Sequence, residues 1–164
     1  MDTIIEFIAE YFFVVVILLA GVIVLVNYRR QLPGLIITGL VVGILSYLLS
    51  KLATALISDP RPFIVTGQPA LIKSATDNGF PSDHTLLLAI VAATLVTVNR
   101  KLGALFLGLA LLVGLARVYV RVHHLWDIIG SIVIVGIVLC LYLVGKAAVE
   151  RRWFARTVSA SSSK

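Results

Sequence analysis

The sequence predicts an all-α fold, a polytopic bundle of about five transmembrane helices. Composition is the first reason, because 60% of the 164 residues are hydrophobic, 13% are charged and the mean hydropathy is +1.06, whereas soluble domains carry about 25% charged residues. The second reason is that hydrophobic residues gather in stretches of about 20, the length that crosses a bilayer core of about 30 Å. We therefore expect one integral membrane domain over residues 1–156 and a disordered, Ser-rich tail over residues 157–164.

The first two spans are expected at residues 4–26 and 34–57. The first stretch carries acidic residues near its start and has no Lys or Arg before it, which is the reverse of a signal peptide, so we expect it to remain as a permanent helix. A short basic loop that contains Arg29 and Arg30 separates the two spans.

The other three spans are expected at residues 84–98, 102–120 and 125–145. Ser82 or Asp83 is a natural N-cap for the helix that begins the series. Short basic segments follow the first and the third of these spans, whereas residues 58–83 form the only long connection in the chain. Loops of this length in a compact domain are usually functional.

Basic residues predict the orientation of the bundle. The short loops and the segment after the last span fall on one side if the chain crosses five times, and the positive-inside rule assigns that side to the cytoplasm. We therefore expect a plasma-membrane protein with its N-terminus outside and its C-terminus inside. This distribution also explains the net charge of +6 without nucleic acid, because the basic residues are dispersed rather than gathered on one face with aromatic residues. The only cysteine, Cys140, allows no intramolecular disulfide.

The predicted outer face carries basic residues that the orientation rule does not explain. They are Arg61, Lys73, Arg117 and Arg121, with Lys51 nearby in the second span. A bound anion would account for them, and the long connection lies on the same face. The sequence therefore predicts an anion site outside.

Polar clusters stand at the ends of the apolar stretches, at residues 59–63, at residues 80–85, and at Arg117 with His123 and Asp127. Ionisable groups at membrane depth are expensive, so their gathering predicts a functional site. A helix that starts near residue 83 also presents unpaired N–H groups and a positive dipole end to an anion.

Arg61 and His84 each have a functional and a structural interpretation. Arg61 lies between two prolines that stiffen its backbone, and its guanidinium matches the oxygens of a phosphate. It is alternatively an interfacial residue that snorkels to headgroups or pairs with Asp59. His84 is either a group beside a bound anion or an interfacial residue after a helix cap.

His123 and Asp127 lie four residues apart, so one helix face would bring them together. A carboxylate behind an imidazole fixes its tautomer and leaves the other nitrogen free to attack or to bind a metal. A structural hydrogen bond between the two would look the same. We expect the adjacent His124 to be interfacial rather than a second functional imidazole, because neighbouring helical positions face different ways. A metal site that uses His84, His123, His124 and Asp127 also remains open.

These residues carry a resemblance to a known family. Arg61-Pro62, Pro81-Ser82-Asp83-His84 and Arg117-x5-His123-x3-Asp127 resemble, in order and spacing, the three signature segments of the type 2 phosphatidic acid phosphatase (PAP2) superfamily of membrane lipid phosphatases. The likeness covers residues 51–145. It implies a phosphatase or diphosphatase that needs no metal and no other cofactor.

The resemblance also implies a role for each residue. His123 would be the nucleophile and form a phosphohistidine, Asp127 would orient its ring, and His84 would act as the general acid for the leaving oxygen. The phosphoryl oxygens would be held by Arg61, Ser82, the backbone N–H of Asp83 and Arg117.

Two positions depart from the family pattern. Thr54 stands where the family carries a Lys, and Lys51 or Lys73 are the candidates to replace that Lys. Asp83 stands where Gly is most common, and it is expected to pair with Arg121 or to tune the neighbouring His. This variant, preceded by Asp-Asn-Gly-Phe, resembles the undecaprenyl-diphosphatase branch.

We therefore expect a membrane enzyme that removes the terminal phosphate of a polyprenyl (undecaprenyl) diphosphate at the outer leaflet and so recycles a lipid carrier. A phosphatase for phosphatidylglycerophosphate or phosphatidic acid is the alternative, since the same residues would serve. A non-catalytic protein that binds anionic headgroups, or a small transporter subunit, is the alternative from another class. The expected partners are the lipid substrate and membrane lipids, without nucleic acid, and the sequence does not fix an oligomeric state.

Overall fold

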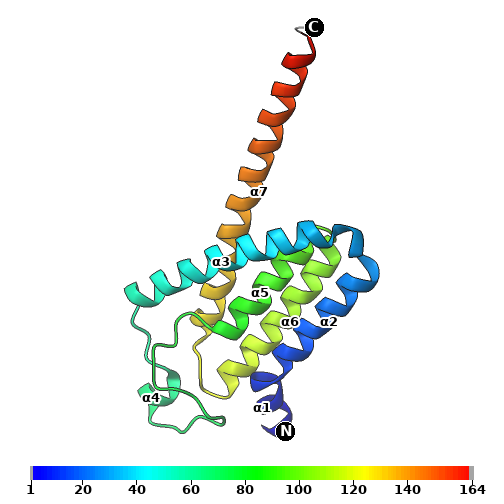
Figure 1. Cartoon of the computed structure of the whole chain (residues 1–164). Helices are drawn as coiled ribbons and strands as arrows, with labels where there is room; N and C mark the ends of the chain where they lie inside the picture. Colours follow the sequence, from blue (N-terminus) through cyan, green and yellow to red (C-terminus); the bar gives the residue numbers. More distant parts are fainter. Residues whose placement is uncertain (1, 163–164) are drawn as a thin grey trace.

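The computed structural model describes residues 2–162, and the side chains of residues 2–153. Over that range it is helical, with turns and loops between the helices, which confirms the predicted all-α bundle (Figure 1). The elements are α1 (Asp2–Glu10), α2 (Phe12–Asn27), the 3-10 helix η1 (Arg29–Gln31), α3 (Leu32–Leu56), α4 (Pro62–Thr66), α5 (Asp83–Val96), α6 (Arg100–Tyr119) and α7 (Leu125–Ser162).

Helix α5 is the centre of the bundle and packs against α3, α6 and α7. One side of α5 is buried with side chains of α6 such as Phe106 and Val113, which have no exposed surface. Its other side packs against Val42 of α3 and Val135 of α7. Gly114 lets α5, α6 and α7 approach closely, because a Cβ there would lie 2.6 Å from Ile128 Cγ2.

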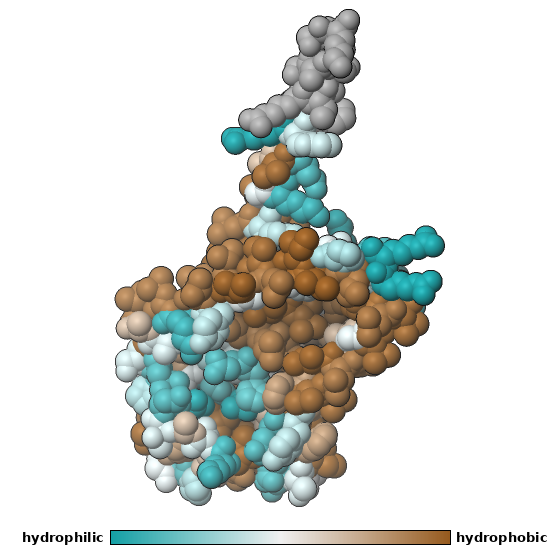
Figure 2. Space-filling view, viewed as in Figure 1, coloured by the Kyte–Doolittle hydropathy of each residue, from teal (hydrophilic) through white to brown (hydrophobic). Residues whose placement is uncertain are grey.

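Several helices have the length and apolarity to span a membrane. Among the described residues, 3 helices pass that test, and up to 4 do so if α1 and α2 count as one bent span. Helix α5 is apolar but only 14 residues long. The outer surface is accordingly hydrophobic over the bundle, while polar residues gather over the loop end near α4 (Figure 2). The protein is therefore a multi-pass membrane protein.

The first predicted span is not one straight helix. The structure breaks it at Tyr11 and bends α1 away from α2 by 55°. Glu10 stands directly before the break, but the residues on either side are apolar enough that hydropathy averaged over the stretch predicts a continuous helix. At the other end of the chain, α7 extends to Ser162 and overlaps the predicted tail. Residues 163–164 lie outside the described range, and disorder of the tail stays a prediction.

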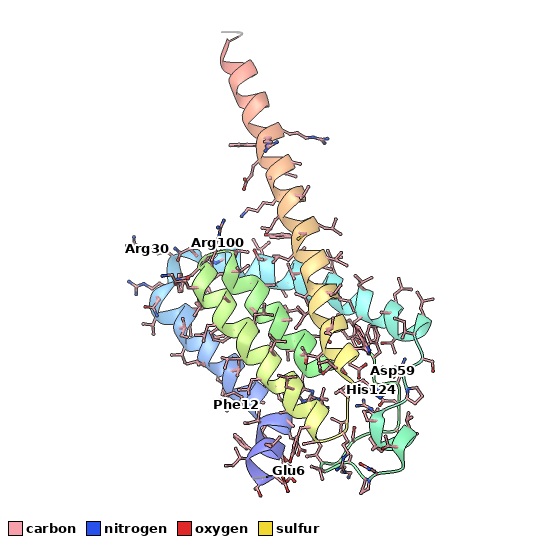
Figure 3. All side chains as sticks on the ribbon, turned by 180° about the vertical axis from the view of Figure 1, so that it is seen from behind. Glu6, Phe12, Arg30, Asp59, Arg100 and His124 are labelled. Carbon is pink, nitrogen blue, oxygen red and sulfur yellow. The ribbon has the colours of Figure 1, made fainter. Side chains whose placement is uncertain are left out.

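The two ends of the bundle differ in chemistry. Arg30 and Arg100 lie at one end, whereas Asp59, His124 and Glu6 lie at the other (Figure 3). The second end is where the α3–α4 connection, the N-terminus of α5 and the α6–α7 connection meet. It therefore gathers all of the polar clusters found in the sequence.

Candidate active site

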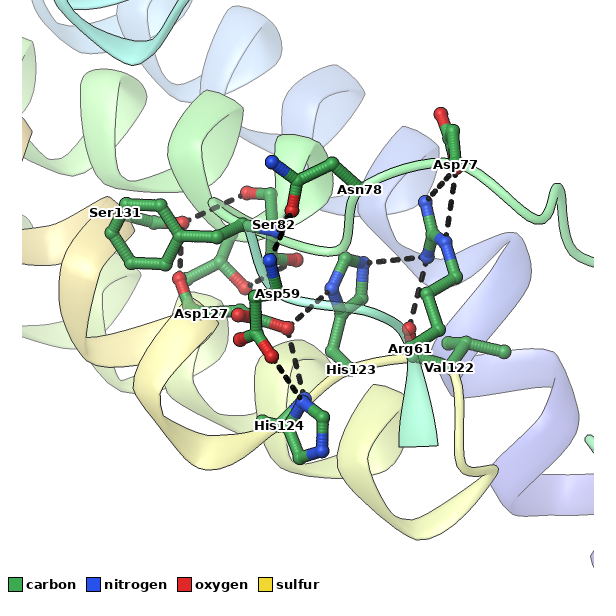
Figure 4. Close-up of polar contacts among 12 residues, drawn as sticks. Asp59, Arg61, Asp77, Asn78, Ser82, Val122, His123, His124, Asp127 and Ser131 are labelled. Atoms are coloured by element: carbon green, nitrogen blue, oxygen red, sulfur yellow. Dashed lines mark hydrogen bonds and ion pairs between the residues drawn. The ribbon is translucent and has the colours of Figure 1, made fainter. Parts of the chain in front are cut away.

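His123 lies in the short connection between α6 and α7, and its side chain is 3% exposed. Its Nδ1 is 3.0 Å from Oδ2 of Asp127, a residue of the first turn of α7 with no exposed surface (Figure 4). A carboxylate accepts a hydrogen bond, so this contact fixes the proton on Nδ1 and leaves a lone pair on Nε2. Burial lowers the pKa of His123, and it outweighs the bond to Asp127, which acts in the opposite direction. The bond to Asp127 therefore leaves Nε2 as the ring nitrogen that is available for chemistry.

Arg61 is the N-cap residue of α4 and is 8% exposed. Its Nη1 donates to the Val122 carbonyl at 2.9 Å and lies 3.5 Å from His123 Nε2. Its Nε and Nη2 both contact Oδ1 of Asp77, at 3.0 and 2.8 Å. Arg61 thus pairs with Asp77 and not with Asp59, and its guanidinium is aimed at the free nitrogen of His123.

Arg117, in the last turn of α6, is also 8% exposed. Its Nη1 donates to the carbonyl of Ala9 at the end of α1, at 2.9 Å. Its buried Nε has no hydrogen-bond partner in the part of the chain that the structure describes. Arg117 and Arg61 both act electrostatically on His84, so the cations share one region. A buried guanidinium without a carboxylate partner is costly unless an anion compensates it.

The N-terminus of α5 supplies the next part of the site. Ser82 occupies the N-cap position, as predicted, but its side chain makes no capping bond. It is fully buried, its N–H donates to the Asp127 carbonyl at 3.3 Å, and its carbonyl accepts from Ser131 at 3.0 Å. Asp83 is exposed, and the half-buried His84 packs edge-on against Phe13 with ring centroids 4.4 Å apart. These contacts fix the start of α5 beside α7.

The candidate replacements for the family's Lys lie in the second half of α3 and in the long connection. Lys51 Nζ is 5.2 Å from the ring centroid of Tyr47, and Lys73 is exposed in the long connection. The hydroxyl of Thr54 is 3.0 Å from the Phe80 carbonyl, so this position ties the end of α3 to the segment before α5. Arg121 donates to the carbonyl of Pro69 at 3.0 Å, which makes it an anchor for the same connection.

His124, which is expected to be interfacial, is half-buried and contacts two carboxylates. Its backbone N–H donates to Asp127 Oδ2 at 2.9 Å, and its Nδ1 lies 3.1 Å from Asp59 Oδ1. Both histidines precede α7, so the rule that adjacent helical positions face different ways does not apply to them. Burial, followed by the neighbouring Asp127 carboxylate, raises the pKa of Asp59.

Sequence reasoning missed the roles of Asp59 and of the segment from Asp77 to Gly79. The Asn-Gly pair was the available signal, because it marks a tight turn. Asn78 accepts from the Asp59 N–H at 3.0 Å, and a Cβ on Gly79 would lie 3.2 Å from Asp127 Oδ2. The long connection thus packs closely against Asp127.

The arrangement favours phosphoryl chemistry over other reactions. His123 Nε2 faces the guanidinium of Arg61, and the guanidinium of Arg117 has a donor that is unsatisfied among the described residues. Phosphoryl transfer depends mainly on positioning and on stabilising charge on the phosphate oxygens. Asp59, His124 and Asp127 are the described residues spaced for a metal ion, with one possible ligand atom each and all within 4.8 Å of one another.

Comparisons with known proteins agree with this geometry. The model of the PAP2 superfamily matches residues 34–150, a range that includes all of the polar clusters. Undecaprenyl-diphosphatase BcrC of Bacillus subtilis (strain 168) is 32% identical over 142 residues, which cover 87% of this chain and 73% of that protein. The bacitracin transport permease protein BcrC of Bacillus licheniformis is 28% identical over 145 residues, which cover 87% and 70%. The chain therefore belongs to the PAP2 superfamily and is a membrane phosphatase.

Proposed function

We propose that this phosphatase removes the terminal phosphate of a polyprenyl diphosphate through a phosphohistidine on His123. The observation that carries the proposal is the position of the His123 ring. Its Nδ1 is held by Asp127 at 3.0 Å and its Nε2 faces Arg61 Nη1 at 3.5 Å. That is the arrangement expected of a nucleophile next to the cation that binds its target.

In the proposed first step, His123 Nε2 attacks the terminal phosphorus while the bond from phosphorus to the bridging oxygen breaks. Polyprenyl phosphate leaves, and His84 protonates its departing oxygen. Arg61 and Arg117 stabilise the charge on the phosphoryl oxygens, together with Ser82 and the backbone N–H of Asp83. Water then attacks the phosphorus of the phosphohistidine and gives a proton to His84 while the bond from phosphorus to His123 Nε2 breaks, which releases inorganic phosphate and regenerates both histidines.

The choice of a polyprenyl diphosphate rests on the relative from Bacillus subtilis, which is an undecaprenyl-diphosphatase and shares 32% of the aligned residues. A lipid substrate also suits a site at one end of a hydrophobic bundle, because its tail stays in the bilayer while its headgroup reaches the arginines (Figure 2). Phosphatidylglycerophosphate and phosphatidic acid present the same terminal phosphate, so they are the competitors that an assay must include.

The proposed site faces outward. Arg30 and Arg100 lie at the opposite end of the bundle from Asp59 and His124, and short basic loops favour the cytoplasmic side (Figure 3). A site at the outer leaflet would act on diphosphate carriers released there, which would return them for another round of export.

Phosphate release by the purified protein tests the proposal. Undecaprenyl diphosphate, phosphatidylglycerophosphate and phosphatidic acid are compared side by side, with and without excess EDTA. We expect preference for the diphosphate, no loss in EDTA, and loss of activity in His123→Ala but not in Lys101→Ala, which changes an exposed residue at the start of α6. Equal rates on all lipids would reject the substrate, and an active His123→Ala variant would reject the mechanism.

A further inference from the structure

Asp59 is held in place by its own backbone. Its N–H donates to Asn78 Oδ1 at 3.0 Å, and its carbonyl accepts from the N–H of Gly79 at 2.8 Å. Both contacts come from the long connection, at the point where it passes closest to Asp127. The Asp59 side chain is therefore fixed beside Asp127, the carboxylate that contacts the His123 ring, and is not a free surface acid (Figure 4).

Asp127 has one satisfied oxygen and one unsatisfied oxygen. Its Oδ2 accepts from the His123 ring and from the His124 backbone, at 3.0 and 2.9 Å. Its Oδ1 is buried and has no hydrogen-bond partner among the described residues. A buried acceptor without a donor is costly, so a neighbouring group is expected to supply one.

The Asp59 carboxyl is the group placed to do so. Its Oδ1 is 3.1 Å from His124 Nδ1, and one oxygen of Asp59, one oxygen of Asp127 and one ring nitrogen of His124 all lie within 4.8 Å of one another. Two carboxylates this close repel each other unless a proton lies between them. A protonated Asp59 would donate a hydrogen bond to Asp127 Oδ1. That bond would remove the repulsion between the two carboxyls and satisfy the buried acceptor.

We propose that Asp59 is a positioning residue for the phosphatase reaction, which holds the Asp127 carboxylate by a hydrogen bond and thereby fixes the His123 ring. Asp59 does not touch the phosphate in this proposal. Asp59 acts on the nucleophile through Asp127. Its carboxyl also contacts Nδ1 of His124. The kinetic part of the proposal rests on the function proposed above.

Two substitutions separate a hydrogen bond from other roles. Asp59→Asn keeps a donor for Asp127 and an oxygen facing His124, whereas Asp59→Ala removes both. We expect kcat on undecaprenyl diphosphate to fall by about 10-fold to about 100-fold in Asp59→Ala with KM nearly unchanged, and to stay within about 3-fold of wild type in Asp59→Asn. Ser58→Ala, a change at the exposed neighbouring residue, is the control and should match wild type.

A spectroscopic readout tests the positioning without turnover. In protein with isotope-labelled histidine, the Nδ1–H proton of His123 should give a downfield resonance because it is bonded to Asp127. We expect that resonance to move in Asp59→Ala and to stay in Asp59→Asn, with helix content checked by circular dichroism. This measurement keeps the two proposals separate, since a wild type without phosphatase activity would reject the proposed function alone.

Three results would overturn the positioning role. The first is an Asp59→Ala variant with wild-type kcat and an unmoved His123 resonance. The second is an Asp59→Asn variant as impaired as Asp59→Ala, which would mean that the charge beside His124 matters rather than the hydrogen bond. The third is wild-type activity that EDTA removes and added Zn²⁺ restores, which would make these side chains metal ligands.

Discussion

Replacing Asp127 by Asn is the perturbation that the geometry makes most quantitative. His123 gains positive charge as Nε2 bonds to phosphorus, and the Asp127 carboxylate stabilises that charge from 3.0 Å. Coulomb attraction at this distance is roughly 5–6 kcal/mol for an effective dielectric constant of about 20, whereas a hydrogen bond to a charged group contributes about 1.5–3 kcal/mol. If Asp127→Asn removes between about 2 and about 5 kcal/mol of this transition-state stabilisation, kcat falls by about 30-fold to about 5,000-fold.

Single-turnover phosphate release by the purified variant measures this loss directly. KM should change little, because Asp127 is fully buried behind the histidine and is not expected to touch the substrate. Asp2→Asn, which neutralises an exposed acid on α1, is the matched control and should retain wild-type rates. A kcat in Asp127→Asn within about 3-fold of wild type would refute the role of the carboxylate, since even the weaker estimate predicts a larger loss.

Three further predictions concern pH, packing and orientation. Because burial lowers the pKa of His123, its reactive neutral form should persist below the ordinary value of about 6.5, and a pH–rate profile should show activity falling only at more acidic pH. Gly79→Ala places a Cβ 3.2 Å from a buried carboxylate oxygen, so we expect roughly 1–3 kcal/mol lower stability in thermal unfolding. In a Cys140→Ser background, a membrane-impermeant thiol reagent should label Ala75→Cys in intact cells and leave Lys101→Cys unlabelled, and the reverse pattern would invert the orientation.

The helical bundle was predictable because hydropathy is a property of single residues summed over long stretches. The same sum hides the bend of 55° at Tyr11, because the apolar residues on both sides outweigh the single charged Glu10 in the average. Spacing within one segment was also informative. The four-residue interval between His123 and Asp127 predicts the contact that the structure contains.

Contacts between distant segments were harder to predict. Arg61 pairs with Asp77 across the long connection, and nothing in the spacing distinguishes Asp77 from the nearer Asp59. Even the local contact of the His124 backbone N–H with Asp127 depends on the exact path of the chain before α7 and not on side-chain type. Such pairings are set by loop geometry, which a residue pattern specifies only weakly.

Trapping the covalent intermediate tests the central claim most directly. Purified protein is mixed rapidly with undecaprenyl diphosphate labelled in its terminal phosphate, denatured at alkaline pH, digested and analysed by mass spectrometry. We predict label on the peptide that contains His123, lost on acid treatment and absent from His123→Ala. Phosphate release by the wild type without label on His123 at any time of quenching would contradict the account.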